Sequence, residues 1–185
     1  MWRTGTAPNP ELPEVQLIRP EVNSDARGTH YNFEEEPLGV LIGHPYVNVS
    51  QSRFAVLRGL HVQHPFQSKI VTCLRGTIFD VAVDARPGSP TLGKHVGVYL
   101  DHSTHAMLYV PEGFLHGFYV VEGDHATVAY YVNKPYNPEK QFSVKWADHK
   151  LDIQWPLRTT VELSHRDRHL AMNFEEYLKL LEKPS

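Results

Sequence analysis

The sequence predicts an all-β fold, a sandwich or barrel with jelly-roll-like closure. One observation is the series of short segments between Val47 and Val132 in which apolar and polar residues alternate. A second is the regular placement of turn residues between them, such as Pro111-Glu112-Gly113 and Glu122-Gly123-Asp124. Short strands separated in this way are typical of double-sheet and barrel architectures. The predicted strands cover residues 56–63, 69–74, 77–85, 97–100, 107–110, 117–121 and 127–132.

The two ends of the chain differ from this β-rich part. Three prolines fall within residues 1–13 and predict a loose N-terminal arm. Near the other end, apolar residues recur at helical spacing from Phe174 to Leu181, so we expect a short amphipathic helix over residues 173–183. A helix of this length needs a surface to pack against. We expect residues 1–185 to form a single domain.

The composition argues against several classes of partner. The formal net charge is −3 and there is no basic tail, so nucleic acid is not an expected partner. The chain has no apolar run of about 18 residues, which predicts that it does not enter a membrane. Its N-terminus lacks the apolar core of a signal peptide, and its single cysteine, Cys73, suits a reducing compartment. These features predict a cytoplasmic protein.

The segment 56–63 and the strand after it contain the first candidate site residues. Simple alternation places Arg58 and His61 on opposite faces, with His61 on the face of Leu57, which we expect to point inward. An inward histidine is either a core group with satisfied hydrogen bonds or a functional group. Lys69 opens the next strand. It is either an edge lysine that reaches solvent or, beside an inward histidine, a group that stabilises an oxyanion.

A metal site is an alternative use of the histidines. The spacing Pro-x-Gly-x-x-His, which ends at His116, resembles the second motif of the cupin barrels, where that histidine often binds a metal. His61, His64 and His116 could supply three ligands. However, a glutamine replaces the second histidine of the first cupin motif, and no glutamate follows before Asp80. A metal-free site is therefore the favoured interpretation.

Two further positions depend on what lies opposite them. Tyr130 and Tyr131 are adjacent in a predicted strand and must face opposite ways, so one of them faces the interior. An inward tyrosine is a core residue unless it opposes a base. Ser164 and Asp167 either cap or precede the last helix, or Asp167 returns to orient a histidine.

Together, these residues resemble the dTDP-4-dehydrorhamnose 3,5-epimerases and related deoxysugar epimerases of antibiotic and surface-polysaccharide pathways. The resemblance runs from about Ile18 to Asp167. The matching stretches are Leu57-Arg58-Gly59-Leu60-His61, Phe79-Asp80-Val81-Ala82-Val83-Asp84, Gly88-Ser89-Pro90-Thr91, Pro111-Glu112-Gly113-Phe114, His116-Gly117-Phe118, Ile153 and Trp155-Pro156. The resemblance implies a cupin-type jelly-roll barrel without metal or cofactor, which inverts C3, C5 or both in a nucleotide-linked 4-keto-6-deoxyhexose. It also implies a homodimer with an exchanged N-terminal strand.

The resemblance also implies roles for individual residues. His61 corresponds to the general base and Asp167 to the residue that orients it. Tyr130, rather than Tyr131, corresponds to the acid, and Lys69 to the group that stabilises the enolate. The implied substrate-binding positions are Arg27, Asn48, Arg58, His116, Tyr136 and Arg166. These residue types suit the chemistry, because inversion beside a ketone needs a base, a stabilised enolate oxygen and an acid on the opposite face.

Several recognition positions depart from the family pattern. Asn32 and Gln141 stand where glutamates are usual, and Tyr46-Val47 replaces a usual Gln-Asp pair. The catalytic residues match the family pattern, whereas these substrate-recognition positions do not. This contrast predicts the same proton chemistry with one of three changes: a different sugar, a different nucleotide such as CDP or GDP, or inversion at only one carbon. A metal-dependent cupin enzyme and a non-catalytic sugar-nucleotide-binding barrel are the other hypotheses.

Overall fold

The computed structural model describes residues 5–8, 11–32 and 45–182. Its strands are β1 (Gly5–Pro8), β2 (Gln16–Arg19), β3 (Glu21–Asp25), β4 (Gly28–Asn32), β5 (Tyr46–Arg53), β6 (Leu57–Gln63), β7 (Lys69–Asp84), β8 (His95–Asp101), β9 (Met107–Val110), β10 (Phe114–Val132) and β11 (Gln141–Ser143). The helical segments are η1 (Pro138–Lys140), α2 (His165–His169) and α3 (Phe174–Leu181). No helix in these described ranges is long and apolar enough to cross a membrane.

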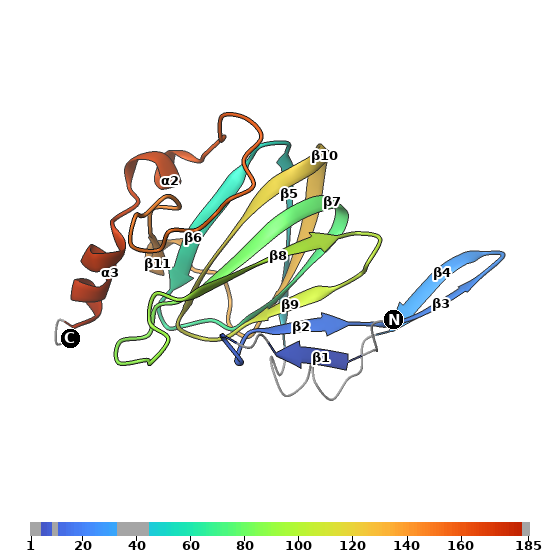
Figure 1. Ribbon diagram of the computed structural model, residues 1–185, viewed down its shortest axis with the longest axis horizontal. Coiled ribbons are helices and arrows are strands. Elements are labelled where there is room, and N and C mark those ends of the chain that lie inside the picture. Colours follow the sequence, from blue (N-terminus) through green and yellow to red (C-terminus); the bar gives the residue numbers. More distant parts are fainter. Residues whose placement is uncertain (1–4, 9–10, 33–44, 183–185) are drawn as a thin grey trace.

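Nine of the strands form one antiparallel sheet that curls into a barrel (Figure 1). The strand order is β1-β2-β9-β7-β10-β6-β11, with β5 paired to β10 and β8 paired to β7. The helices α2 and α3 lie together at one end of this sheet. The prediction of an all-β fold with a short C-terminal helix is confirmed.

Two predicted turns lie inside long, bent strands. β7 continues through Arg75-Gly76, and β10 continues through Glu122-Gly123-Asp124. The pairing of β10 with β7 shifts register several times around residues 120–128, as expected where bulges bend a strand. As a result, β7 pairs with β9 at its start and with β8 in its second half. Both long strands therefore contribute to two parts of the barrel wall, which explains why short punctuated segments were expected instead.

Apolar side chains fill the barrel and the layer between its wall and the C-terminal helix. Val71, Ile78, Leu108 and Phe118 belong to the first cluster. The second cluster joins residues of β6 and β7 to two buried aromatic residues of α3, Phe174 and Tyr177. Burial of each large apolar side chain contributes about 1.5–3 kcal/mol. These contacts provide the packing surface that the predicted C-terminal helix needs.

The loose N-terminal arm predicted for residues 1–13 needs correction over its described part. β1 pairs with β2 in antiparallel register, and Leu12 is fully buried in the barrel cluster. Proline excludes a helix, but an edge strand tolerates it, because an edge residue does not need to donate a ladder hydrogen bond. The prolines were therefore evidence against a helix rather than against ordered structure.

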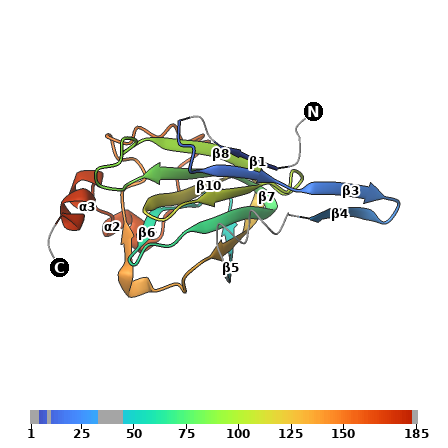
Figure 2. The same ribbon diagram turned by 90° about the horizontal axis from the view of Figure 1, so that it is seen from below.

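β3 and β4 form a separate two-stranded sheet. Figures 1 and 2 both show this hairpin projecting away from the barrel. All five residues of β3 are exposed. An isolated hairpin of this kind is marginally stable in water, so we expect it to need a partner surface.

Candidate active site

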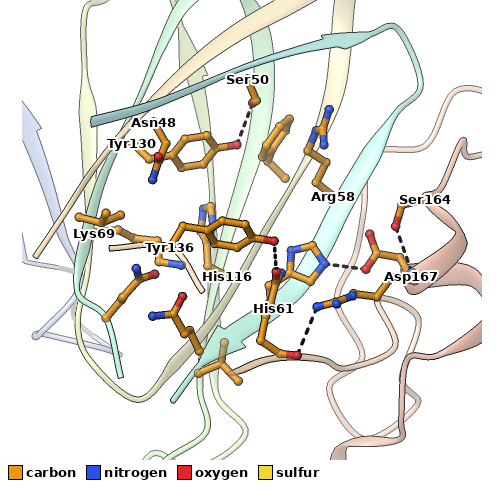
Figure 3. A pocket seen from close by; sticks show the side chains of 17 residues that line it. Asn48, Ser50, Arg58, His61, Lys69, His116, Tyr130, Tyr136, Ser164 and Asp167 are labelled. Atoms are coloured by element: carbon orange, nitrogen blue, oxygen red, sulfur yellow. Dashed lines mark hydrogen bonds and ion pairs between the residues drawn. The ribbon is translucent and has the colours of Figure 1, made fainter. Parts of the chain in front are cut away.

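A cavity of about 510 Å³ lies among β5, β6, β10 and the segment that contains α2 (Figure 3). Nine of the ten residues expected in the site line it. They are Asn48, Arg58, His61, Lys69, His116, Tyr130, Tyr136, Arg166 and Asp167. The exception is Arg27.

β6 brings Arg58 and His61 to the same cavity, although simple alternation places them on opposite faces. In the pairing with β10, Gly59 and Leu60 together oppose the single residue Gly117. One extra residue is a β-bulge, which shifts the alternation by one position. Gly59 has a φ of 137°, and a Cβ at this position would lie 2.6 Å from the Cα of Gly117. The prediction of opposite faces is wrong because the two glycines allow this bulge.

His61 and Asp167 form a close, largely buried pair. His61 Nε2 lies 2.6 Å from Asp167 Oδ1, and the two side chains are 25% and 2% exposed. The Ser164 hydroxyl accepts a hydrogen bond from the Asp167 backbone N–H and so caps α2, a separate helix rather than the last one. Burial opposes the charge on Asp167, but hydrogen bonds from His61 and its surroundings hold the pKa of Asp167 below its ordinary value. An ionised carboxylate here fixes the His61 tautomer with its proton on Nε2.

Tyr130 and Lys69 reach the cavity from neighbouring strands. In the pairing of β10 with β7, Tyr130 faces Val71 and Lys69 faces Val132, so all four side chains lie on one face. Tyr131 lies on the other face, where it packs in a separate apolar cluster. Because β7 is an internal strand, the interpretation of Lys69 as an edge lysine is wrong.

Burial dominates the electrostatics of Lys69 and Tyr130. It lowers the pKa of Lys69 to about 8, while the charge on Asp80 acts in the opposite direction. It also raises the pKa of Tyr130, while a hydrogen bond from Ser50 acts in the opposite direction. Among the described residues, none forms a hydrogen bond or ion pair with Lys69 Nζ. This ammonium group is therefore available to an anionic ligand.

His116 belongs to a second histidine–carboxylate pair that sequence reasoning missed. Its Nε2 lies 2.7 Å from Asp80 Oδ1, and both side chains are buried. Burial lowers the pKa of His116, while the Asp80 carboxylate favours its protonated form. The other carboxylate oxygen, Asp80 Oδ2, is buried without a hydrogen-bond partner in the described part of the chain. An aspartate in the middle of an apolar strand was the available signal, because such a residue is rarely buried without a partner.

The remaining lining residues form the outer part of the cavity. Tyr136 donates a hydrogen bond of 2.8 Å to the side chain of Gln141, which also lines the cavity. The Arg166 guanidinium donates to the backbone carbonyls of Gln141 and Pro138. Arg58 donates to the Ser52 hydroxyl. Neither arginine has a carboxylate partner within the described ranges, so both retain positive charge for a ligand.

Arg27 does not reach the cavity of its own chain. It lies in the turn of the β3–β4 hairpin, and its side chain is 91% exposed and paired with Asp25. Arg27 therefore does not line the site of its own chain. The exchanged N-terminal strand that the resemblance implies would instead bring Arg27 to the cavity of a neighbouring subunit, and this expectation stays a prediction.

The three histidines proposed as metal ligands do not converge. His64 Nε2 lies 3.1 Å from the Tyr177 hydroxyl, and its ring packs against Phe66 and Phe142. His61 and His116 each direct Nε2 at a different carboxylate. Within the ranges that the structure describes, no group of three or more His, Cys, Asp or Glu residues is arranged to hold a metal ion. The geometry gives no support to the metal-dependent alternative.

Comparison with known proteins gives a consistent result. The family model described as dTDP-4-dehydrorhamnose 3,5-epimerase matches residues 9–175. The dTDP-4-dehydrorhamnose 3,5-epimerase of Escherichia coli (strain K12) is 37% identical over 177 residues, which cover 92% of this chain and 95% of that protein.

Two crystal structures show similar architecture. One is dTDP-6-deoxy-D-glucose-3,5-epimerase from Legionella pneumophila in complex with dTDP-4-keto-L-rhamnose, with a TM-score of 0.87 and 37% identity, covering 95% of this chain and 97% of that chain. The other is a 3'-monoepimerase from Streptomyces bikiniensis in complex with dTDP-quinovose, with a TM-score of 0.84 and 32% identity, covering 96% of this chain and 92% of that chain. The predicted cupin-type jelly-roll barrel is confirmed.

Proposed function

The chain belongs to the dTDP-4-dehydrorhamnose 3,5-epimerase family, and we propose that its cavity inverts carbon centres beside the ketone of a nucleotide-linked 4-keto-6-deoxyhexose. It is a carbohydrate epimerase that acts at C3, C5 or both. A dTDP-linked sugar is the expected substrate. One observation carries the proposal: three groups line the same cavity, namely an imidazole held by a carboxylate, a phenol, and an ammonium group that pairs with no carboxylate among the described residues.

His61 is the base in this proposal. With its proton on Nε2 and donated to Asp167, the other ring nitrogen, Nδ1, holds the lone pair that removes a proton from carbon. No described residue forms a hydrogen bond with Nδ1, so this lone pair is free for substrate. The Asp167 carboxylate then stabilises the imidazolium that forms, as the aspartate of a catalytic triad does.

Lys69 stabilises the enolate oxygen. A C–H bond beside a ketone is a weak acid, and a positive group placed at the developing oxyanion lowers the barrier to breaking it. Lys69 is partly buried, and no described residue forms an ion pair with its ammonium group, so this group is available to the substrate oxygen. Burial lowers the pKa of Lys69 only to about 8, which is above neutral pH, so the group is mainly protonated there.

Tyr130 is the acid. Inversion requires the new proton to reach the ring face opposite the base, and a phenol on another wall of the cavity can supply it. Figure 3 shows the Tyr130 ring extending into the cavity from the wall formed by β10, whereas His61 enters from β6. A base and an acid on separate walls can flank one sugar ring.

Arg58 and Arg166 bind the diphosphate. Guanidinium groups match phosphate oxygens in pairs, and both side chains keep their charge because carbonyl and hydroxyl oxygens, rather than carboxylates, accept their hydrogen bonds. Asn48 and Tyr136 complete the binding surface, with the Tyr136 ring available to contact the nucleotide base.

The active form is a homodimer in which the β3–β4 hairpin of each chain extends to its partner. The hairpin projects from the barrel and presents Arg27 at its turn, and Arg27 is not among the residues that line the cavity around His61 in its own chain. The outer face of β5 offers Val47 and Val49, which are 57% and 61% exposed. Exposed apolar strand residues of this kind are typical of association surfaces.

The cytoplasmic location remains a prediction.

The departures in the recognition set determine which substrates need testing. Gln141 lines the cavity and holds Tyr136 by its side-chain oxygen, so this position acts on the nucleotide side. Tyr46 and Val47 lie on β5, and Asn32 ends β4. A changed sugar, a changed nucleotide or inversion at a single carbon are the outcomes to separate.

The decisive experiment incubates the purified protein with dTDP-, CDP- and GDP-linked 4-keto-6-deoxyhexoses in deuterated water. NMR and mass spectrometry identify which carbons incorporate deuterium and which invert. Incorporation at C3, C5 or both of one of these sugars is the expected result. Tight binding of a sugar nucleotide without any incorporation would refute the proposal in favour of a binding protein.

A further inference from the structure

Ser50 is a cavity residue for which the sequence suggested no role. Its hydroxyl oxygen lies 3.1 Å from the hydroxyl oxygen of Tyr130. In the pairing of β5 with β10, Ser50 lies opposite Val128, and Asn48 lies opposite Tyr130. These two pairs are separated by the pair of Val49 and Ala129, so Ser50 and Tyr130 point to the same face of the sheet, the cavity face. Within the described ranges this is the single hydrogen bond to the phenol, and Figure 3 shows it clearly.

We propose that Ser50 is a positioning residue for Tyr130: its hydroxyl aims the phenol into the cavity and donates a hydrogen bond to the phenolate left after protonation of the substrate carbon. This inference rests on the function proposed above.

The proton balance of the step requires a donor at this position. The enolate electron pair forms the new C–H bond while the O–H bond of Tyr130 breaks, which leaves a phenolate in the cavity. Before the step either hydroxyl can donate, but afterwards the phenolate has no hydrogen and Ser50 must donate. The phenolate later regains its proton from water, and His61 releases the proton it took from carbon.

The environment of Tyr130 makes this donor necessary. Burial raises the pKa of the phenol and so weakens it as an acid. The Ser50 hydrogen bond and the charge of Arg58 act in the opposite direction. Without the hydroxyl of Ser50, proton transfer from Tyr130 becomes harder, whereas proton removal by His61 on the other wall is unaffected.

The rest of β5 has the same arrangement. Ser52, two residues further along the same face, accepts a hydrogen bond from Arg58. Asn48 lines the cavity two residues before Ser50. The opposite face of the strand carries the exposed Val47 and Val49. Asn48, Ser50 and Ser52 therefore share the cavity face of β5, whereas Val47 and Val49 lie on its outer face.

The test compares wild type with the variants Ser50→Ala, Ser50→Thr, Tyr130→Phe and the double variant Ser50→Ala/Tyr130→Phe. Deuterium incorporation reports proton removal, and the inverted product reports proton delivery. Because hydrogen bonds to charged groups are among the stronger ones in proteins, we expect Ser50→Ala to lower inversion about tenfold relative to incorporation. Ser50→Thr keeps the hydroxyl and should restore the ratio. In the Tyr130→Phe background, Ser50→Ala should change nothing further.

A second measurement needs no substrate. Unfolding of the same four proteins gives a double-mutant cycle, and we expect a coupling of about fivefold in the unfolding equilibrium constant. Equal loss of incorporation and inversion in Ser50→Ala, or a full effect of Ser50→Ala when Tyr130 is already phenylalanine, would overturn the inference. An inactive wild type would count against the proposed function, while the unfolding cycle would still test the Ser50–Tyr130 contact.

Discussion

Replacement of Lys69 by methionine should make the protein more stable and, at the same time, much less active. Methionine preserves most of the length and apolar surface of the side chain but removes its charge. In the folded protein Lys69 is partly buried in the cavity, and this burial lowers its pKa from 10.5 to about 8. That difference corresponds to about 3 kcal/mol, because each pKa unit is worth about 1.4 kcal/mol. This is the upper limit of the stability that Lys69→Met can gain at neutral pH.

The pH dependence of this gain has a definite sign. Below about pH 8 the lysine is charged in both the folded and the unfolded chain, and the full cost of burying its charge is present. Between about pH 8 and pH 10.5 the unfolded chain binds a proton that the folded chain does not, so wild-type stability rises with pH. The advantage of Lys69→Met should therefore be largest near pH 7 and shrink as the pH approaches 10.5.

Denaturant unfolding at pH 7 and pH 9.5 measures the stability, and deuterium incorporation measures the activity. Loss of one group that stabilises an oxyanion typically lowers the rate about 10²–10³-fold. Lys94→Met is the matched control, since Lys94 is exposed and lies outside the cavity; it should leave both properties unchanged. A Lys69→Met variant that is no more stable than wild type at pH 7, or equally active, would show that the lysine is not a buried charge at the reaction centre.

Three further variants test the other parts of the site. Asp167→Asn should lower the rate of proton removal about 10²–10⁴-fold without unfolding the protein, since an amide can select the wrong tautomer of His61; deuterium incorporation at unchanged rate would contradict this. Gly59→Ala should destabilise the fold by more than about 2 kcal/mol, because the new Cβ would meet the Cα of Gly117 at 2.6 Å; an unchanged unfolding midpoint would show that no close approach exists. Arg58→Ala should raise KM for the nucleotide sugar more than it lowers kcat, because Arg58 is proposed to bind the diphosphate; steady-state kinetics with substrates of different phosphate content measures both constants, and a loss mainly in kcat would contradict this role.

The sequence was most informative where one periodic pattern dominates. The alternating segments predicted the barrel strands, and the helical spacing from Phe174 to Leu181 predicted α3. The predicted breaks at Arg75-Gly76 and Glu122-Gly123-Asp124 were wrong, because glycine marks a bend within a strand as readily as a turn between strands. Local sequence does not distinguish the two when the strand's partners are distant in the chain.

The candidate site depended on contacts between distant residues, which a single sequence does not contain. His61 and Asp167 are 106 positions apart, and His116 and Asp80 are 36 apart. The resemblance to known epimerases identified the first pair but not the second. The bulge at Gly59 reversed the expected relation of Arg58 to His61, and its cause lies on another strand, at Gly117.

The proposed mechanism requires His61 to remove a proton and Tyr130 to deliver one across the same cavity. The most direct test is an NMR time course of a 4-keto-sugar nucleotide in deuterated water with His61→Ala and Tyr130→Phe beside wild type. We expect no deuterium at any ring carbon with His61→Ala, and deuterium without full inversion with Tyr130→Phe. Deuterium incorporation by His61→Ala at the wild-type rate would contradict the role of His61 as the base.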